Sequence, residues 1–362
     1  MSLTQIFKVD FSPKLIEIRI FTAIVSLLFS LIAFGTDDLI NSDGVLYMDM
    51  ARALLAGGLS ATAELYNWPF FSILVAGIHK LTGLSLEQSG NLVNIAMFVI
   101  FTDALVLICN KTLPNNRQVF IAALFILGFT LFNDYRAYLF RDMGYWAFSA
   151  LALYQFVKFL ETPTWLNANM WQITIVIAIL FRVEGVAILF ALPFFVFFNN
   201  KSIKDAFFQL VKLWLLVSLL ALLSLAIALS VGSLPSAFGK FNEIFLYINF
   251  TQLSSGFAEK SAIIAEQLLN KYSDKYSELI FGSGLFVMML WKFIEALSIS
   301  YFIYYIYIYF SKSRPTSINR KHTGLILYFI AINFIVLSVF VFTHFFLSTR
   351  YSVTVSYTHL RA

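Results

Sequence analysis

The chain has 362 residues, of which 60% are apolar, 18% aromatic and 12% charged, and its formal net charge is +5. Soluble domains carry about 25% charged residues, so this composition excludes an ordinary soluble globular protein. The alternating ten-residue pattern of a membrane β-barrel is absent. The basic residues are scattered among segments that flank apolar runs, which excludes a nucleic-acid-binding surface. The composition therefore predicts an all-α polytopic membrane protein.

The first long apolar segment covers residues 15–34 and has the roughly 20 residues that a membrane-spanning helix needs. It is longer than a signal-peptide core and lacks a convincing cleavage site, which favours an anchor that stays in the protein. Lys8, Lys14 and Arg19 lie before or at its start. Because basic residues flank the cytoplasmic ends of membrane helices, this pattern places the N-terminus in the cytoplasm.

The next apolar run, residues 68–81, is short and amphipathic. If it crosses the membrane, the basic loops around Lys111 and Lys201 fall outside the cytoplasm. If it lies on the outer surface, these loops and the basic cluster at residues 312–321 all fall inside. The positive-inside rule favours the second interpretation. We therefore expect residues 35–88 to form an external, periplasmic first loop that contains short amphipathic helices.

Eight further spans complete a predicted bundle of about nine transmembrane helices. They are expected near residues 88–109, 118–133, 143–160, 170–182, 186–199, 207–230, 284–310 and 323–343. The external segments are then 35–88, 133–142, the turn at Arg182, 231–282 and the residues from His344 onward. The charged residues of 231–282 predict an amphipathic helix over the membrane. No internal repeat divides the chain, so we expect a single domain over residues 1–354.

The chain ends in the octapeptide Val-Ser-Tyr-Thr-His-Leu-Arg-Ala, residues 355–362. This stretch is polar, breaks the membrane pattern and resembles translated sequencing-adaptor sequence. We expect it to be a non-native tail and leave it out of the fold argument. The natural chain is expected to continue past Tyr351.

Charged residues gather on the predicted external face. The first loop carries Asp37, Asp38, Asp43 and Asp49, and later segments add Arg136, Arg141, Asp142, Arg182, Glu184 and Arg350. Arginine binds phosphate oxygens with two parallel hydrogen bonds, and a carboxylate can accept a proton from an attacking hydroxyl. The pattern suits chemistry on a phosphorylated lipid. The alternative is a set of interfacial anchors and loop ion pairs.

The order of these residues resembles the GT-C superfamily of membrane glycosyltransferases, which use polyprenyl-phosphate sugars. That group includes the protein O-mannosyltransferases, the aminoarabinose transferases of lipid A and the oligosaccharyltransferase catalytic subunits. The resembling motifs are, in chain order, Asp43-Gly-Val-Leu-Tyr47 with Ala51, Leu55 and Gly57; Tyr66-Asn-Trp68-Pro69-Phe70 running to Lys80-Leu-Thr-Gly83; Arg141-Asp142; Phe181-Arg182-Val-Glu184-Gly185; and Arg350-Tyr351. The resemblance covers about residues 1–200 and is thin over 207–343. It implies a GT-C-type helical bundle.

The resemblance also implies roles for individual residues. Asp43 corresponds to the catalytic carboxylate of the first external loop and would orient or deprotonate the acceptor during a single inverting displacement at the sugar's anomeric carbon. Asp142 would assist through the acceptor or a divalent cation, although no cluster with ligand spacing specifies a metal. Contacts to the lipid phosphate or the sugar are expected from Tyr47, Tyr66, Arg141, Arg182, Glu184 and Arg350.

Each of these roles has a structural alternative. The alternatives are helix N-caps or solvated positions for Asp37 and Asp38, an N-cap for Asp142, a solvated helix face for Asp49, an ion pair of Arg182 with Glu184, and snorkelling interface side chains for Arg136 and Arg141. Asp37 and Asp38 are also the rivals of Asp43 for the catalytic role. Motif context favours Asp43.

The sequence thus predicts a membrane glycosyltransferase that moves a sugar from a polyprenyl-phosphate donor to a lipid, glycan or protein acceptor. We expect it in a bacterial inner membrane, with its active site facing the periplasm or the cell exterior. A Gly-rich phosphate loop is absent, which disfavours a nucleotide-sugar enzyme. The alternative class is a transporter or flippase of lipid-linked sugars, which would place Asp103, Lys292 and Glu295 along one central cavity.

Overall fold

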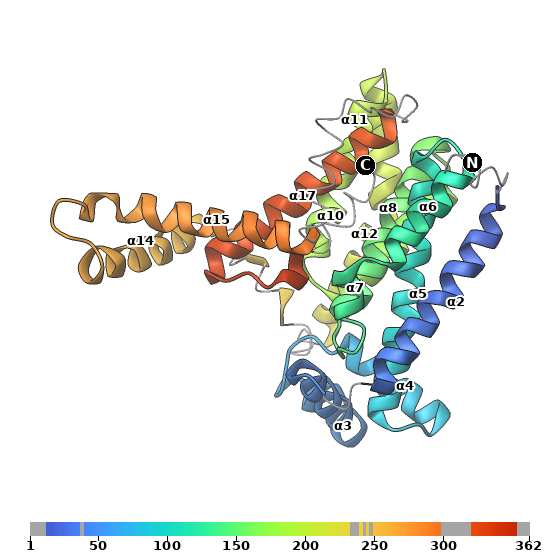
Figure 1. Cartoon of the computed structure of the whole chain (residues 1–362), viewed down its shortest axis with the longest axis horizontal. Coiled ribbons are helices and arrows are strands. Elements are labelled where there is room, and N and C mark those ends of the chain that lie inside the picture. The colour runs from blue at the N-terminus through green and yellow to red at the C-terminus, as the bar shows by residue number, and fades with distance from the viewer. Residues whose placement is uncertain are drawn as a thin grey trace, which may run out of the picture.

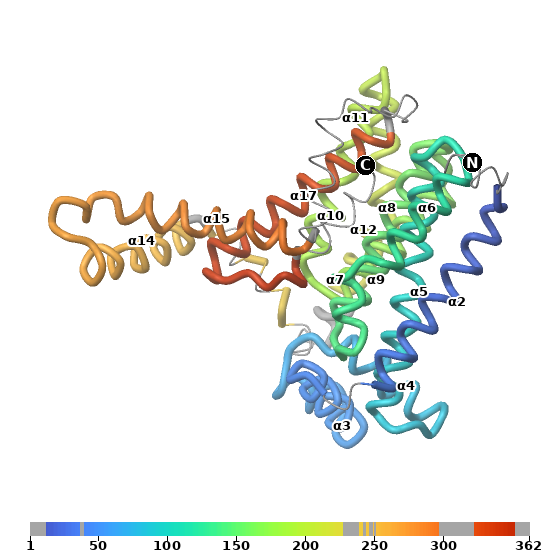
Figure 2. Tube along the Cα trace, viewed as in Figure 1, coloured from blue at the N-terminus to red at the C-terminus, as the bar shows by residue number. Residues whose placement is uncertain are grey.

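The computed structural model describes residues 12–36, 40–231, 239–241, 244–245, 249–297 and 320–352, and every regular element in these ranges is a helix. Figure 1 shows the arrangement, and Figure 2 follows the chain. Helices α3 and α4 lie at one end of the bundle, and the start of α2, near the N-terminus, lies at the other end. The prediction of an all-α fold is confirmed for the described residues.

The helices follow one another along the chain with short connections. The first half comprises α2 (Leu15–Thr36), α3 (Ser42–Ala63), α4 (Phe70–Thr82), α5 (Leu86–Thr112), α6 (Asn116–Leu127), α7 (Thr130–Asp134), α8 (Asp142–Glu161) and α9 (Trp165–Phe181). The second half comprises α10 (Gly185–Ala191), the 3₁₀ turn η1 (Leu192–Phe195), α11 (Val196–Asn199), α12 (Ile203–Val231), α14 (Phe250–Gln267), η3 (Asp274–Tyr276), α15 (Ser277–Leu297), α17 (Arg320–His344) and η4 (Thr349–Ser352).

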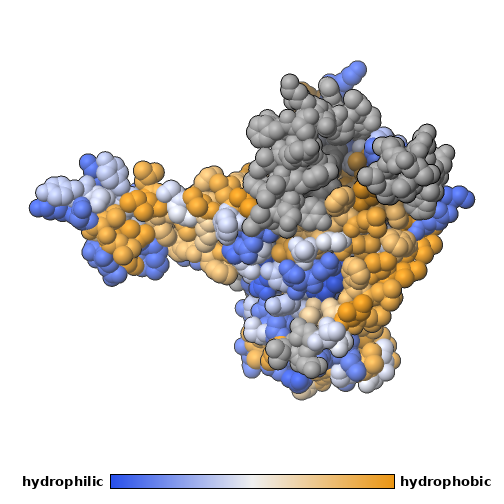
Figure 3. Space-filling view, viewed as in Figure 1, coloured by the Kyte–Doolittle hydropathy of each residue, from blue (hydrophilic) through white to orange (hydrophobic). Residues whose placement is uncertain are grey.

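Five of the described helical segments are long and apolar enough to cross a membrane. They are Leu15–Thr36, Leu86–Thr112, Ile203–Ala226, Asp274–Ala296 and His322–His344. The segment at the edge of the bundle, α2, exposes a row of large apolar side chains, and Figure 3 shows the resulting hydrophobic surface. A contiguous apolar surface of this kind is stable against lipid and costly in water. The structure is consistent with an integral multi-pass membrane protein.

Helix α8 forms the centre of the molecule, packed between α5 and α9. Most of its side chains are buried, including those of Trp146, Leu153 and Phe156. A helix that is apolar on all sides is stable only when neighbours cover every face. Its first residue, Asp142, is therefore held firmly in place by the core.

Two predicted spans are interrupted in the structure. The segment 118–133 divides into α6 and α7, because the amide of Asn133 donates a 2.9 Å hydrogen bond to the carbonyl of Leu127 and satisfies the end of α6. The segment 186–199 divides at Pro193, which has no N–H to continue an α-helix. The predicted spans 118–133, 170–182 and 186–199 thus correspond to shorter apolar helices.

The predicted amphipathic segment 231–282 contains α14, and α15 follows as its antiparallel neighbour. Figure 1 shows these two helices side by side, extended away from the rest of the molecule. They pack on each other and on α17 through a separate apolar cluster around Met289 and Val341. The predicted span 284–310 overlaps α15, and its residues after Leu297 lie outside the described ranges.

Candidate active site

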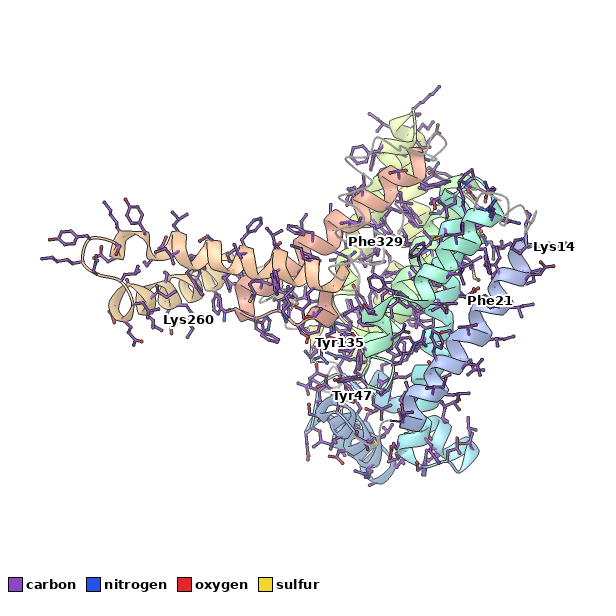
Figure 4. The ribbon with its side chains drawn as sticks, in the orientation of Figure 1. Lys14, Phe21, Tyr47, Tyr135, Lys260 and Phe329 are labelled. Atoms are coloured by element: carbon purple, nitrogen blue, oxygen red, sulfur yellow. The ribbon has the colours of Figure 1, made fainter. Side chains whose placement is uncertain are left out.

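The predicted site residues meet at the end of the bundle formed by α3 and α4. They come from the first turn of α3, the start of α8, the α9–α10 turn and η4. The charges of Asp43 and Arg350 act on Tyr47 and Tyr135, respectively. Figure 4 shows these two tyrosines where α3 approaches α7. Four chain segments that are distant in sequence therefore supply one cluster.

The position of Asp43 is set by a contact between α3 and the segment before α8. Asn41 donates to the carbonyl of Leu139 at 3.1 Å and accepts from its N–H at 2.8 Å, as a paired backbone would. Gly44 allows the close approach, since a Cβ there would lie 2.8 Å from the Cβ of Leu139. Asn94 adds a 2.7 Å bond to the carbonyl of Tyr138. These contacts hold the first turn of α3 beside Arg141 and Asp142.

Asp43 forms an ion pair with Arg350, with 2.5 Å between Oδ2 and Nη1. The Asp43 side chain remains 32% exposed, so a substrate can reach it. Burial alone would lower the pKa of Arg350, but the carboxylate of Asp142 and the hydrogen bond that Arg350 donates to Asp43 raise it. Arg350 is therefore a permanent cation that orients Asp43.

Asp142, Arg182 and Glu184 form a second, more deeply buried group. Arg182 donates to Asp142 through Nη1 and to Glu184 through Nη2. Gly144 makes this pairing geometrically feasible, because a Cβ there would overlap the ring of Phe181, the residue before Arg182. Burial would raise the pKa of Glu184, but the charge and hydrogen bond of Arg182, with a contribution from Arg141, lower it to about 2. Both carboxylates thus have a charged partner in a site with little water.

Tyr351 connects the two groups. Its ring lies 4.4 Å from Cζ of Arg182 and 5.1 Å from Cζ of Arg350, so the two guanidinium carbons are at most 9.5 Å apart. Its hydroxyl is 3.2 Å from Nη2 of Arg350. An arginine near the face of an aromatic ring is attracted by the electron-rich face. Asp43 and Arg182 therefore belong to one site.

A third group lies around Tyr66. Its ring centroid is 5.0 Å from Cζ of Arg141 and 4.9 Å from Nζ of Lys240. Tyr47 is buried nearby and packs edge-on against Phe71 at 5.2 Å. Burial raises the pKa of the Tyr47 hydroxyl, with the charge of Arg141 acting in the opposite direction, so Tyr47 stays protonated. It can act as a hydrogen-bond donor.

Two cavities adjoin the charged residues. One, of about 30 Å³, lies between Asp142, Arg182, Glu184 and the α17 residues Asn333, Leu337 and Phe340. The other is an apolar groove of about 340 Å³ between α10 and α17, and Val186, Phe190, Ile244 and Val339 line its wall. Glu184, Val336 and Phe340 line both cavities. A small charged pocket and a larger apolar groove are thus neighbours that share part of their lining.

Three buried polar atoms of the site have no hydrogen-bond partner among the described residues. They are Nη1 of Arg141, Oε2 of Glu184 and Nε of Arg350. Buried polar groups are nearly always paired, so orphans in one place indicate a missing ligand or water. The set offers two donors and one acceptor.

The structure brings together all eight predicted site residues, while their catalytic and binding roles stay predictions. The N-cap interpretation of Asp142 is wrong, because α8 begins with Asp142 and its N-cap is Arg141. The snorkelling interpretation of Arg136 is also wrong: it is buried against Ser26, Ser30 and Asn133.

The remaining alternatives divide into three cases. Asp49 pairs with Arg52 on an exposed face of α3, as a solvated position would. The predicted pairing of Arg182 with Glu184 is present, together with Asp142. Asp37 and Asp38 lie outside the described residues.

Sequence reasoning gave no role to Lys240, which lies in the predicted amphipathic segment 231–282. It also gave no role to Tyr351 beyond its place in the Arg350-Tyr351 motif. In the described part of the chain, no three His, Cys, Asp or Glu residues converge as metal ligands. Asp43, Asp142 and Glu184 instead have arginine partners. No protein-family model matches the chain, and a search of curated proteins finds no match to it.

Proposed function

We propose that this protein is a membrane glycosyltransferase of the GT-C type, with about nine membrane-crossing segments and its active site on the extracytoplasmic face. It takes a sugar from a polyprenyl-phosphate donor and passes it to a hydroxyl or amide of a lipid, glycan or protein acceptor. The observation that carries the proposal is the contiguity of the charged pocket and the apolar groove, which share Glu184, Val336 and Phe340. A lipid-linked phosphate needs both environments at once.

The reaction that suits this arrangement is a single displacement. The acceptor's nucleophilic atom forms a bond to the anomeric carbon while the bond from that carbon to the phosphate oxygen breaks. The phosphate leaves with the electron pair, stabilised by the site's cations. Asp43 takes the acceptor proton, because it is the site's most accessible carboxylate and Arg350 holds it in place.

The test is a comparison of cell-envelope glycans and lipids by mass spectrometry, in a deletion strain complemented with the wild type or with Asp43→Asn. Losing a general base typically slows a reaction by about 10²–10⁴-fold. We expect Asp43→Asn to lose the sugar-bearing product while the protein still accumulates in the membrane. Asp49→Asn, which changes an exposed carboxylate on the same helix, is the matched control and should retain the product. Full product with Asp43→Asn would refute the base role.

A further inference from the structure

The short helix η4 carries two residues of the candidate site. Arg350 pairs with Asp43, and the ring of Tyr351 contacts Arg182. A single turn of helix such as η4, Thr349–Ser352, is unstable by itself and takes its position from the elements packed against it. The direction of the Arg350 guanidinium therefore depends on what holds η4.

The arm formed by α14 and α15 packs against η4 through α15. Leu347, two residues before η4, is buried in the same apolar cluster as Met289 of α15. Three residues later on α15, Nζ of Lys292 donates a 3.1 Å hydrogen bond to Oγ1 of Thr349, the first residue of η4. Glu295 holds the same Nζ at 2.7 Å. Helix α15 thus gives this segment one apolar contact and one charged hydrogen bond.

The turn that leads from α17 to η4 has an unusual backbone. Phe345 has a φ of 54°, in the left-handed region that residues with a side chain rarely adopt. Its ring packs against the ring of Phe281 on α15, with the centroids 5.3 Å apart. Such a conformation is unfavourable by itself and persists where the surrounding structure imposes it. The arm therefore helps to keep η4 turned towards the site.

The contact between α15 and η4 lies beside the Asp43–Arg350 pair. Tyr135 shares a side-chain hydrogen bond with Ser348, and the charges of both Arg350 and Glu295 act on it. Nη1 of Arg350 is 2.5 Å from Oδ2 of Asp43. If η4 moved away from α15, this distance would change, and reacting groups tolerate only small displacements.

We propose that Lys292 is a positioning residue for the sugar transfer: by binding Thr349 it fixes η4, and η4 directs Arg350 towards Asp43. This inference rests on the proposed function, in which Asp43 takes the acceptor proton. Lys292 acts through η4 and does not itself contact the substrate. It gives a role to a lysine that the sequence connected only with a transport path.

The first measurement is hydrogen–deuterium exchange of the purified full chain, which reports how firmly a segment is held. Two amides can be followed, because the N–H of Phe345 donates to Val341 at 2.7 Å and that of Tyr351 donates to Ser348 at 3.0 Å. Lys292→Met keeps an unbranched side chain but removes the charged donor. We expect faster exchange over these amides and unchanged exchange in α8.

The second measurement is the sugar-bearing product in the complemented deletion strain. A catalytic group misplaced by about 1 Å can slow a reaction by about 100-fold, and η4 keeps its other contacts, so we expect Lys292→Met to lower the product about tenfold. The matched control is Lys260→Met, which removes an exposed lysine from the same arm. Figure 4 shows Lys260 far from Tyr135. This control should leave exchange and product unchanged.

Variants of Thr349 test the hydrogen bond from its other side. Thr349→Val removes the acceptor and should lower the product as Lys292→Met does, whereas Thr349→Ser keeps Oγ and should retain it. Because both losses come from one bond, the double variant Lys292→Met/Thr349→Val should lose no more product than either single variant. Losses that multiply to about 100-fold would show two independent structural effects and would contradict the proposal.

The outcomes keep this proposal and the proposed function apart. Unchanged exchange over residues 345–352 in Lys292→Met would overturn the positioning role, whatever the reaction is. Faster exchange with wild-type amounts of product would overturn it as well, since Lys292 would then hold η4 without directing Arg350. A wild-type strain with no sugar-bearing product beyond that of the deletion strain would instead refute the proposed function, and the exchange would still show whether Lys292 holds η4.

Discussion

Two sets of charged residues lie in this molecule, and they differ in how their partners are shared. Between α2 and α5, Arg19 donates two hydrogen bonds, of 2.7 and 2.8 Å, to the two oxygens of Asp103. Each charge has one partner, and each oxygen has one donor. At the α3–α4 end, three carboxylates share Arg182 and Arg350, while Arg141 has no ion pair with any residue in the described part of the chain.

This difference in pairing indicates that the Arg19–Asp103 pair is structural and that the charged cluster at the α3–α4 end is a candidate ligand site. In a one-to-one ion pair, the attraction between the two charges offsets the cost of removing them from water, and no ligand is needed to complete the pairing. The site cluster keeps a buried donor on Arg141, another on Arg350 and an acceptor on Glu184 unpaired, next to a cavity. Such incomplete pairing is the pattern expected where a substrate completes the hydrogen bonds.

The same comparison weakens the transporter hypothesis. That hypothesis required Asp103, Lys292 and Glu295 on one central path. Asp103 is instead bound by Arg19, and Lys292 binds Glu295 on its own helix, at 2.7 Å, and Thr349 at 3.1 Å. Asp103 is thus paired between α2 and α5, while Lys292 and Glu295 pair with each other on α15, so each of these three charges already has a partner.

Removing Arg182, the cation that two carboxylates share, is the strongest test of the difference between the site cluster and the Arg19–Asp103 pair. Arg182→Gln leaves Asp142 and Glu184 buried without their partner, which should destabilise the protein by about 3–5 kcal/mol. Thermal unfolding of the detergent-purified protein, followed by tryptophan fluorescence, measures the loss. Arg52→Gln removes an arginine from an exposed pair on α3 and should change stability by less than about 0.5 kcal/mol. Equal stability of the two variants would mean that the cluster is not electrostatically coupled.

A smaller effect is expected from the one-to-one pair. Asp103→Asn leaves Arg19 without its counter-ion, but Arg19 lies in the second turn of α2 and is 38% exposed. Its long side chain can turn towards the membrane surface, so the loss should be about 1 kcal/mol. Product formation in the complemented deletion strain should match the wild type. Loss of product with normal protein levels would place Asp103 in the functional machinery and erase the distinction between the two sets.

Much of this arrangement could be predicted from the sequence, because it depends on local pattern. Apolar segments of membrane length predicted the positions of helices. Charged residues at the ends of these segments predicted which residues lie on the same side of the membrane. Asp43 was expected on a loop, whereas the structure places it in the first turn of α3, which starts at Ser42.

The pairings could not be predicted, because they depend on packing between distant segments. Arg182 reaches Asp142 only because Gly144 lets Phe181 approach α8. Lys240 reaches Tyr66 through a turn that has no periodicity. The break between α6 and α7 depends on one amide, that of Asn133, which binds the carbonyl of Leu127. Hydropathy averages over many residues and does not register single contacts of this kind.

A pH experiment sharpens the comparison at the site itself. The pKa of Glu184 is lowered from 4.5 to about 2, so its folded state binds fewer protons than the unfolded state between these values. Its stabilising contribution is then complete above about pH 4.5 and is lost as the pH falls towards 2. The difference in unfolding free energy between the wild type and Glu184→Gln should therefore be constant from pH 5 to 8 and should shrink below pH 4.5. A difference that already changes near pH 6 would show that Glu184 is not held by Arg182, and the cluster would have to be regarded as a set of independent charges.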